Sequence, residues 1–163
     1  MINIKIAKKE DIEALMSSRL EMLKVVNDLP EDYEYSDEMI HESRDYFLHG
    51  DHLSVLAFDG DEVIGCASMS FIWIMPTFDH PTGKRAHLMN VYTRSEYRRQ
   101  GIARKMVGLL IKEARSRGVT EISLDSTRSG RPLYQSMGFT DSTEGMVLTK
   151  DRIKQSMRDN DDI

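Results

Sequence analysis

The sequence predicts one α/β domain built on a mixed sheet. A hairpin signal, Asp59-Gly60-Asp61, separates two runs of strand-forming residues, which predicts antiparallel neighbours. A strand, a long helix and another strand then follow one another from His87 to Asp125, as in a parallel crossover. The length of 163 residues fits a single domain.

The first half of the chain is predicted to supply three strands and two helices. Isoleucines alternate with polar residues over 2–6, which indicates a short strand, and apolar residues recur at helical spacing over 12–26. A second helix is expected over 36–50, with a serine cap at its start and a glycine at its end. The runs 53–58 and 63–74 are predicted to form the hairpin.

The second half contains the clearest helix, because an unbroken apolar stripe runs from Gly101 to Arg117 and Gly118 closes it. From Lys150 the chain is polar and charged, so we expect it to fray or to form a loose helix. The other elements are predicted as a loop at 75–84, strands at 87–93, 121–125 and 146–149, and a short helix at 130–137.

Composition excludes several classes of protein. The net charge of −5 and a pI near 5.5 argue against a nucleic-acid partner. No apolar run approaches the roughly 18–20 residues of a membrane span, and the first ten residues do not resemble a signal peptide, so we expect no membrane association and a cytoplasmic location. A single cysteine, Cys66, excludes an internal disulfide and a multi-cysteine zinc site, and no metal is expected.

The charge is unevenly distributed along the chain. Residues 28–45 hold eight acids and one base, whereas residues 94–117 hold eight bases and two acids. The basic segment suits an anionic cofactor, and the acidic segment would attract a cationic acceptor, unless it is an ordinary solvated surface.

The basic segment contains a turn that leads into the long helix. The first N–H groups of a helix are unpaired and carry partial positive charge, so phosphate oxygens bind there. Gly101 permits close approach of backbone and phosphate, and arginines before it add charged donors. A solvated basic turn before an ordinary helix is the alternative that spacing alone leaves open.

Two motifs carry a resemblance to a known family. Arg98-Arg99-Gln100-Gly101-Ile102-Ala103 resembles the Gln/Arg-x-x-Gly-x-Gly/Ala signature of the GNAT superfamily of N-acetyltransferases. Leu133-Tyr134 followed by Gly138-Phe139 looks like that family's second signature, and Tyr134 lies 36 residues after Arg98. The order of elements matches from residue 2 to about 149.

The resemblance implies a GNAT-like acyl-CoA N-acyltransferase fold. This fold has a mixed, mostly antiparallel sheet of six to seven strands with about four flanking helices. Residues 1–150 would form the single N-acetyltransferase domain, and residues 151–163 a charged C-terminal tail. Relatives are often dimers, and the exposed last strands would pair across two chains to form a homodimer, although no residue decides the oligomeric state.

The resemblance also implies how acetyl-CoA, the cosubstrate, would bind between two splayed strands. Its pantetheine arm would pair with the strand at Val91, Tyr92 and Thr93, where a bulge near Val91 aims an amide at the thioester carbonyl. The pyrophosphate would lie on the backbone amides of Arg98, Arg99, Gln100, Gly101, Ile102 and Ala103. The family often has Asn where this chain has Thr127, whose hydroxyl replaces only part of an amide's hydrogen bonding.

The implied reaction is direct attack of a neutral primary amine on the thioester. By this resemblance Tyr134 occupies the family's general-acid position. A phenol suits that role, since it is protonated at pH 7 and can return a proton to the CoA thiolate. His87 is the candidate base, since imidazole exchanges a proton near neutral pH, with a water chain or a structural role as alternatives. Asn90 and Trp73 are candidates for substrate binding. The alternative for Trp73 is a packing role in the core.

Three hypotheses about function remain. The first is an N-acetyltransferase acting on a small-molecule amine. The second is a protein or peptide N-acetyltransferase. The third is a CoA-binding sensor without catalysis, which the departure at Thr127 keeps open and the presence of Tyr134 disfavours.

Overall fold

The computed structural model describes residues 1–142 and 145–160, and these divide into two compact units. The first unit is Met1–Ser126 and the second begins at Thr127; each is described by itself. The prediction of one domain over 1–150 stays a prediction. Within the described ranges no helix combines the length and apolar character that crossing a bilayer requires.

The first unit is built on a five-stranded sheet with the order β1-β2-β3-β4-β5. Its strands are β1 (Ile2–Ile6), β2 (His52–Asp59), β3 (Glu62–Trp73), β4 (Lys84–Thr93) and β5 (Glu121–Leu124). Neighbours pair antiparallel except β4 and β5, which pair parallel. The hairpin and the parallel crossover that the sequence predicted are therefore both present.

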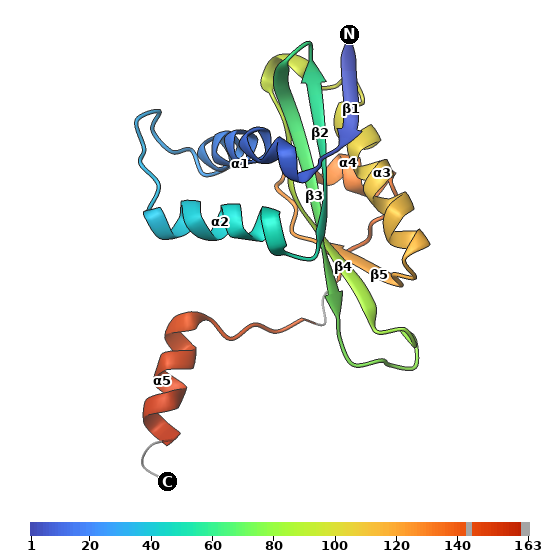
Figure 1. The fold of residues 1–163 in the computed structure, drawn as a ribbon. Coiled ribbons are helices and arrows are strands. Elements are labelled where there is room, and N and C mark those ends of the chain that lie inside the picture. Colours follow the sequence, from blue (N-terminus) through green and yellow to red (C-terminus); the bar gives the residue numbers. More distant parts are fainter. Residues whose placement is uncertain (143–144, 161–163) are drawn as a thin grey trace. The chain divides into compact units, whose positions relative to one another are not determined.

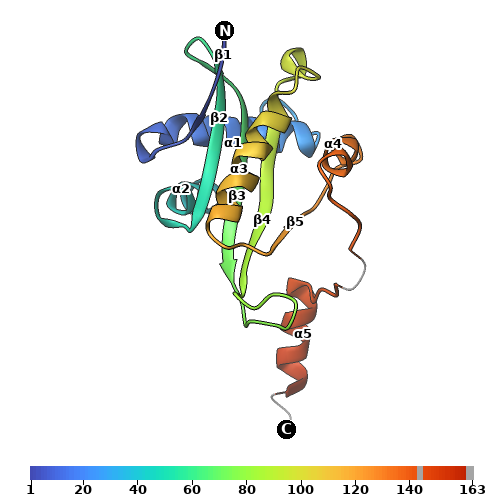
Figure 2. The same ribbon diagram turned by 90° about the vertical axis from the view of Figure 1, so that its right-hand side faces the viewer.

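Helices cover both faces of this sheet (Figures 1 and 2). Helices α1 (Ile12–Val26) and α2 (Asp37–His49) lie against one face, and α3 (Ile102–Ser116) lies against the other. Short 3-10 turns, Lys9–Asp11 and Ser95–Tyr97, precede α1 and α3.

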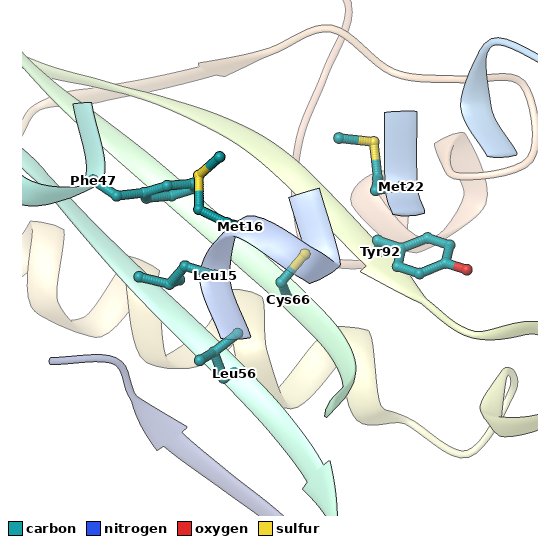
Figure 3. Packing of buried hydrophobic residues seen from close by; sticks show 7 residues of the cluster. All are labelled: Leu15, Met16, Met22, Phe47, Leu56, Cys66 and Tyr92. Carbon is teal, nitrogen blue, oxygen red and sulfur yellow. The ribbon is translucent and has the colours of Figure 1, made fainter. Parts of the chain in front are cut away.

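Each face has its own buried apolar layer. Between α1, α2 and the sheet lie Leu15, Met16, Met22, Phe47, Leu56, Cys66 and Tyr92 (Figure 3). On the other face, α3 buries Met106, Val107, Leu110 and Ala114 completely. These two layers fix β3 and β4 from both sides, so the strands that carry the site are held rigidly.

Helix α2 begins as the sequence predicts, with Ser36 as its cap. The Ser36 side chain accepts a hydrogen bond from the Met39 amide at 3.2 Å, and two acids occupy the first turn. We expect Ser36→Ala to lower the free energy of unfolding by about 1 kcal/mol, since the amide loses its partner. Chemical denaturation measures this, and a loss no larger than that of Ser17→Ala, an exposed serine inside α1, would contradict the cap's contribution.

The second unit contains the short helix α4 (Arg131–Ser136) and α5 (Lys150–Asn160). The prediction of six to seven strands is wrong, because 146–149 forms no strand and the described residues hold five. A strand requires a neighbour for its ladder hydrogen bonds, and Met146 and Val147 are instead 97% and 91% exposed. The described residues hold five α-helices rather than about four, because the predicted tail is helical through Asn160.

Candidate active site

The two central strands separate beyond a short paired stretch. Strands β4 and β5 pair in parallel from Arg85 opposite Glu121 to Leu88 opposite Leu124. Strand β5 ends there, whereas β4 continues to Thr93. From Met89 onward β4 therefore presents a backbone edge that β5 does not cover, and an extended ligand can pair with such an edge as an added strand does.

A bulge lies on β4 immediately past this point. Cys66 is opposite Tyr92 and Ser68 is opposite Met89, so Asn90 and Val91 together face one residue of β3. Asn90 has φ +58°, in the left-handed region, where asparagine is among the better-tolerated residues. Bulges turn backbone groups out of the ladder and occur near active sites. The bulge was expected near Val91, and the structure has it at that residue and its neighbour.

Asn90 is held on the α1 side of the sheet by three hydrogen bonds. Its side-chain oxygen accepts from Arg19 Nη1 at 3.2 Å, and its amide nitrogen donates to Cys66 Sγ at 3.5 Å. The Cys66 thiol donates to the Asn90 carbonyl at 3.2 Å. Burial raises the pKa of the Cys66 thiol to about 12, so it remains a protonated donor. Cys66 thus supports the bulge, consistent with the packing role that the sequence suggested.

The end of β4 is anchored by charges from α1 and β3. Arg94 donates from Nε and Nη2 to the two carboxylate oxygens of Glu21, at 2.8 and 3.0 Å, and also pairs with Glu62. Tyr92 donates from its hydroxyl to Glu21 at 2.9 Å, and burial, followed by this carboxylate, raises the Tyr92 pKa to about 12. The Tyr92 side chain therefore has a structural role, and only the Tyr92 backbone is available to bind a ligand.

The turn before α3 has the geometry of an anion cradle. Arg99 and Gly101 have φ +60° and +77° on either side of Gln100, an alternation that directs successive N–H groups toward one side. No side chain caps α3, and a Cβ added to Gly101 would meet nothing within 4 Å. Open space thus lies directly over the helix N-terminus, where phosphate binding is favourable.

The side chains of this turn divide into two groups. Arg98, Arg99 and Gln100 are exposed, and Arg98 Nε donates to the Thr93 carbonyl at 2.9 Å, which holds the turn against the end of β4. Ile102 is buried in the core and Ala103 is half-buried, so these two residues offer their amides only. The Thr93 hydroxyl oxygen is buried and has no hydrogen-bond partner among the described residues.

His87 lies on the α1 and α2 face of the sheet, one ladder position before β4 and β5 part. It pairs with Ser123, whose hydroxyl is 2.8 Å from His87 Nδ1. Its Nε2 is 3.7 Å from the Asp125 carboxylate, and the ring is about a quarter exposed. This places an imidazole near the opening with one nitrogen fixed by a serine.

Trp73 is not brought to this region. It pairs with Lys84 at the end of the β3–β4 pair that adjoins the connecting loop 74–83. It lies on the face opposite to His87 and is 83% exposed. There it lines a groove of about 440 Å³ together with Phe71 and Arg117, whose guanidinium lies 4.2 Å from the Phe71 ring centroid. The site residues that the structure does bring together in this unit are those of β4 and of the turn before α3.

Tyr134 and Thr127 belong to the second unit. The Tyr134 ring packs edge-on against Phe139, with centroids 5.9 Å apart, and burial raises the pKa of its phenol. Thr127 accepts a hydrogen bond from the Gly130 amide at 3.2 Å, so its hydroxyl stabilises the turn that leads into α4.

Sequence reasoning missed Arg19 and Glu21, which both project from α1 onto β4. A signal was present for Arg19, because it lies four residues after Leu15 and three before Met22, both of which are buried. A charged residue at such a position is directed toward the sheet rather than to solvent.

Comparison with known proteins identifies the family. Residues 20–139, well over half of the chain, match the model of the acetyltransferase (GNAT) family. A predicted acetyltransferase from Clostridium acetobutylicum, solved with acetyl-CoA, superposes with a TM-score of 0.80 at 28% identity, covering 91% of this chain and 96% of that one. The aminoglycoside N-acetyltransferase AAC(6')-Iy, solved with CoA, shares the fold, with a TM-score of 0.71, 16% identity, and coverage of 92% of this chain and 95% of that one.

Among curated proteins, human N-acetyltransferase 8 is 44% identical over 66 residues, which cover 37% of this chain and 29% of that protein. The match thus spans under a third of this relative's length. The matched residues 20–139 include both motifs and the strands β2 to β5. The chain therefore belongs to the acetyltransferase (GNAT) family of acetyl-CoA-dependent N-acetyltransferases, the family that its two motifs resemble.

Proposed function

We propose that this chain transfers the acetyl group of acetyl-CoA directly to a primary amine of a small molecule, within one ternary complex. The observation that carries the proposal is the bulge at Asn90 and Val91, located where β4 leaves β5. It supplies a backbone donor for the oxyanion at the point where a thioester lying along β4 would end.

Acetyl-CoA would lie along the uncovered edge of β4 and turn onto the N-terminus of α3. The cradle around Gly101 accepts the pyrophosphate, and the exposed Arg98 and Arg99 add charge to it. The pantetheine amides pair with the backbone of Val91 to Thr93, whose side chains are not needed for this contact. Family membership and the relative solved with acetyl-CoA support this cosubstrate.

The chemistry requires two proton transfers and no covalent enzyme intermediate. The neutral amine attacks the thioester carbon, the C–S bond breaks, and the CoA sulfur leaves as a thiolate. Tyr134 returns a proton to that sulfur, and the nitrogen loses its proton to His87 or to a water that His87 holds. His87 suits this role because Ser123 fixes one ring nitrogen beside the opening.

Calorimetric titration with acetyl-CoA tests the donor half of the proposal. We expect one molecule to bind per chain, and Arg98→Ala to weaken binding several-fold, because a charge-assisted phosphate contact is lost. Lys24→Ala, a basic residue of α1 bonded to the Glu31 carbonyl, is the control and leaves the affinity unchanged. Absence of binding by the native chain would overturn the proposal.

The acceptor half is tested by following free thiol release with a panel of amines, aminoglycosides and peptides. Turnover of small amines with no turnover of peptides supports the proposal, whereas turnover of peptides alone indicates a protein N-acetyltransferase. Acetyl-CoA binding without any turnover indicates a sensor.

A further inference from the structure

Arg19 is a half-buried cation for which the described residues supply no counterion. Its single hydrogen bond among the described residues is the one from Nη1 to the Asn90 side chain, and it forms no ion pair with a carboxylate of those residues. The other half-buried arginines among the described residues are Arg44, Arg85 and Arg94, and each of them pairs with at least one acid. Removing a charge from water without a partner is costly, so such a group marks a place where a ligand supplies the opposite charge.

The environment of Arg19 does not provide that charge. The groups that interact with it electrostatically are Cys66, Tyr35 and Tyr46, all neutral at pH 7, and burial lowers its pKa. The Tyr35 hydroxyl donates to the Leu20 carbonyl, and the Tyr46 hydroxyl bonds with Ser70. The acids of 28–45 form no bond with this guanidinium in the structure.

The unused side of the guanidinium has the shape of a carboxylate site. With Nη1 bound to Asn90, Nε and Nη2 remain, and together they form the fork that binds two oxygens of a carboxylate side by side. Neither nitrogen is among the fully enclosed polar atoms that lack a partner, so solvent reaches them. Asn90, which orients the guanidinium, is itself a bulge residue.

Arg19 therefore lies beside the position where the proposed function places the thioester carbonyl. It comes from α1, on the face of the sheet that also carries His87, and not from the turn that would hold the cofactor's phosphates. An anionic group bound by Arg19 would belong to the acceptor and lie close to its reacting nitrogen.

We infer that Arg19 is a specificity residue that binds a carboxylate of the acceptor, and that the acceptor is an amine with an acidic group near its nitrogen, of the α-amino acid type. This rests on the proposed function. It reverses the preference for cationic acceptors that the acidic segment alone suggested. A phosphate has the same pairing chemistry, so the experiment includes both.

The test measures kcat/KM by thiol release for L-amino acids against their amides, and for phosphoethanolamine against ethanolamine. Rates are compared per unprotonated amine, because an amide and an acid differ in the pKa of their amine. The native chain is expected to favour the acid by about 10- to 100-fold, the range of a charge-assisted pair. Arg19→Gln removes this preference, and Arg19→Lys, which keeps the charge but lacks the fork, retains part of it.

Arg44→Gln is the matched control, because Arg44 is a surface arginine already paired with Glu13, and it leaves the acid-to-amide ratio unchanged. A purely structural Arg19 would lower the rates of acid and amide equally on substitution, and that result overturns the inference. Equal native rates for acid and amide overturn it as well. A chain that turns over no amine overturns the proposed function and this inference with it, so the two failures are distinct.

Discussion

Gly101→Ala is expected to weaken acetyl-CoA binding at least about tenfold, while costing no more stability than a matched change elsewhere. Gly101 has φ +77° at the N-cap of α3, and a Cβ there costs roughly 1–2 kcal/mol of backbone strain. The chain relieves that strain by rotating the peptide, which turns the adjacent amides away from the phosphate. The added methyl also occupies the open space above the helix, and a loss of about 1.4 kcal/mol is tenfold in Kd.

Gly60→Ala provides the control for strain. Gly60, in the β2–β3 turn, has φ +60°, and an added Cβ there also meets nothing within 4 Å. Both variants should lose similar free energy of unfolding, measured by denaturation, whereas calorimetry with acetyl-CoA should detect a change for Gly101→Ala alone. Equal affinities of the two variants would show that the cradle does not hold the cofactor.

The sheet and its main helices follow from local patterns in the sequence. The Asp59-Gly60-Asp61 signal and the stripe of α3 each involve residues close in sequence, so turn chemistry and periodicity predict them directly. The prediction of a strand at 146–149 was wrong because a strand depends on a neighbouring strand, and no local pattern indicates whether such a neighbour is present. The polar, charged tail was expected either to fray or to form a loose helix, and residues 150–160 form a helix.

The parts of the site that are formed by the backbone could be predicted from the sequence. The Gly101 turn is a local motif, and the bulge near Val91 was implied by family resemblance and is present. Trp73 lies away from β4 residues 89–93 because it pairs with Lys84, on the face opposite to His87, and the face and position of a strand residue follow from register rather than from residue type. Helical spacing places Arg19 on the buried side of α1, but its contact with Asn90 joins residues 71 positions apart, and no local pattern pairs residues so far separated.

Tyr134→Phe is expected to lower the rate of acetyl transfer by about 10²–10⁴ while leaving the Kd for acetyl-CoA unchanged, since a positioned general acid contributes an effect of that size. The variant removes one hydroxyl and keeps the ring, which packs edge-on against Phe139, so the local fold is retained. Single-turnover thiol release is the required measurement, because steady-state kcat also reports product release. Tyr33→Phe is the control: it removes the hydroxyl of an exposed tyrosine that precedes α2, and it should leave the rate unchanged.

The pH dependence separates an acid from a residue that merely packs. Burial raises the pKa of Tyr134, so the protonated phenol persists to a higher pH than an ordinary tyrosine, and the rate should fall only above its ordinary pKa of 10. The sign is fixed because the acid works only while protonated: the rate holds below the folded pKa and declines as pH rises through it. Tyr134→Phe should have a low rate without this alkaline decline. If the variant instead keeps the native rate and profile, the CoA thiolate leaves the acyl carbon without a proton from Tyr134, and solvent acts as the general acid.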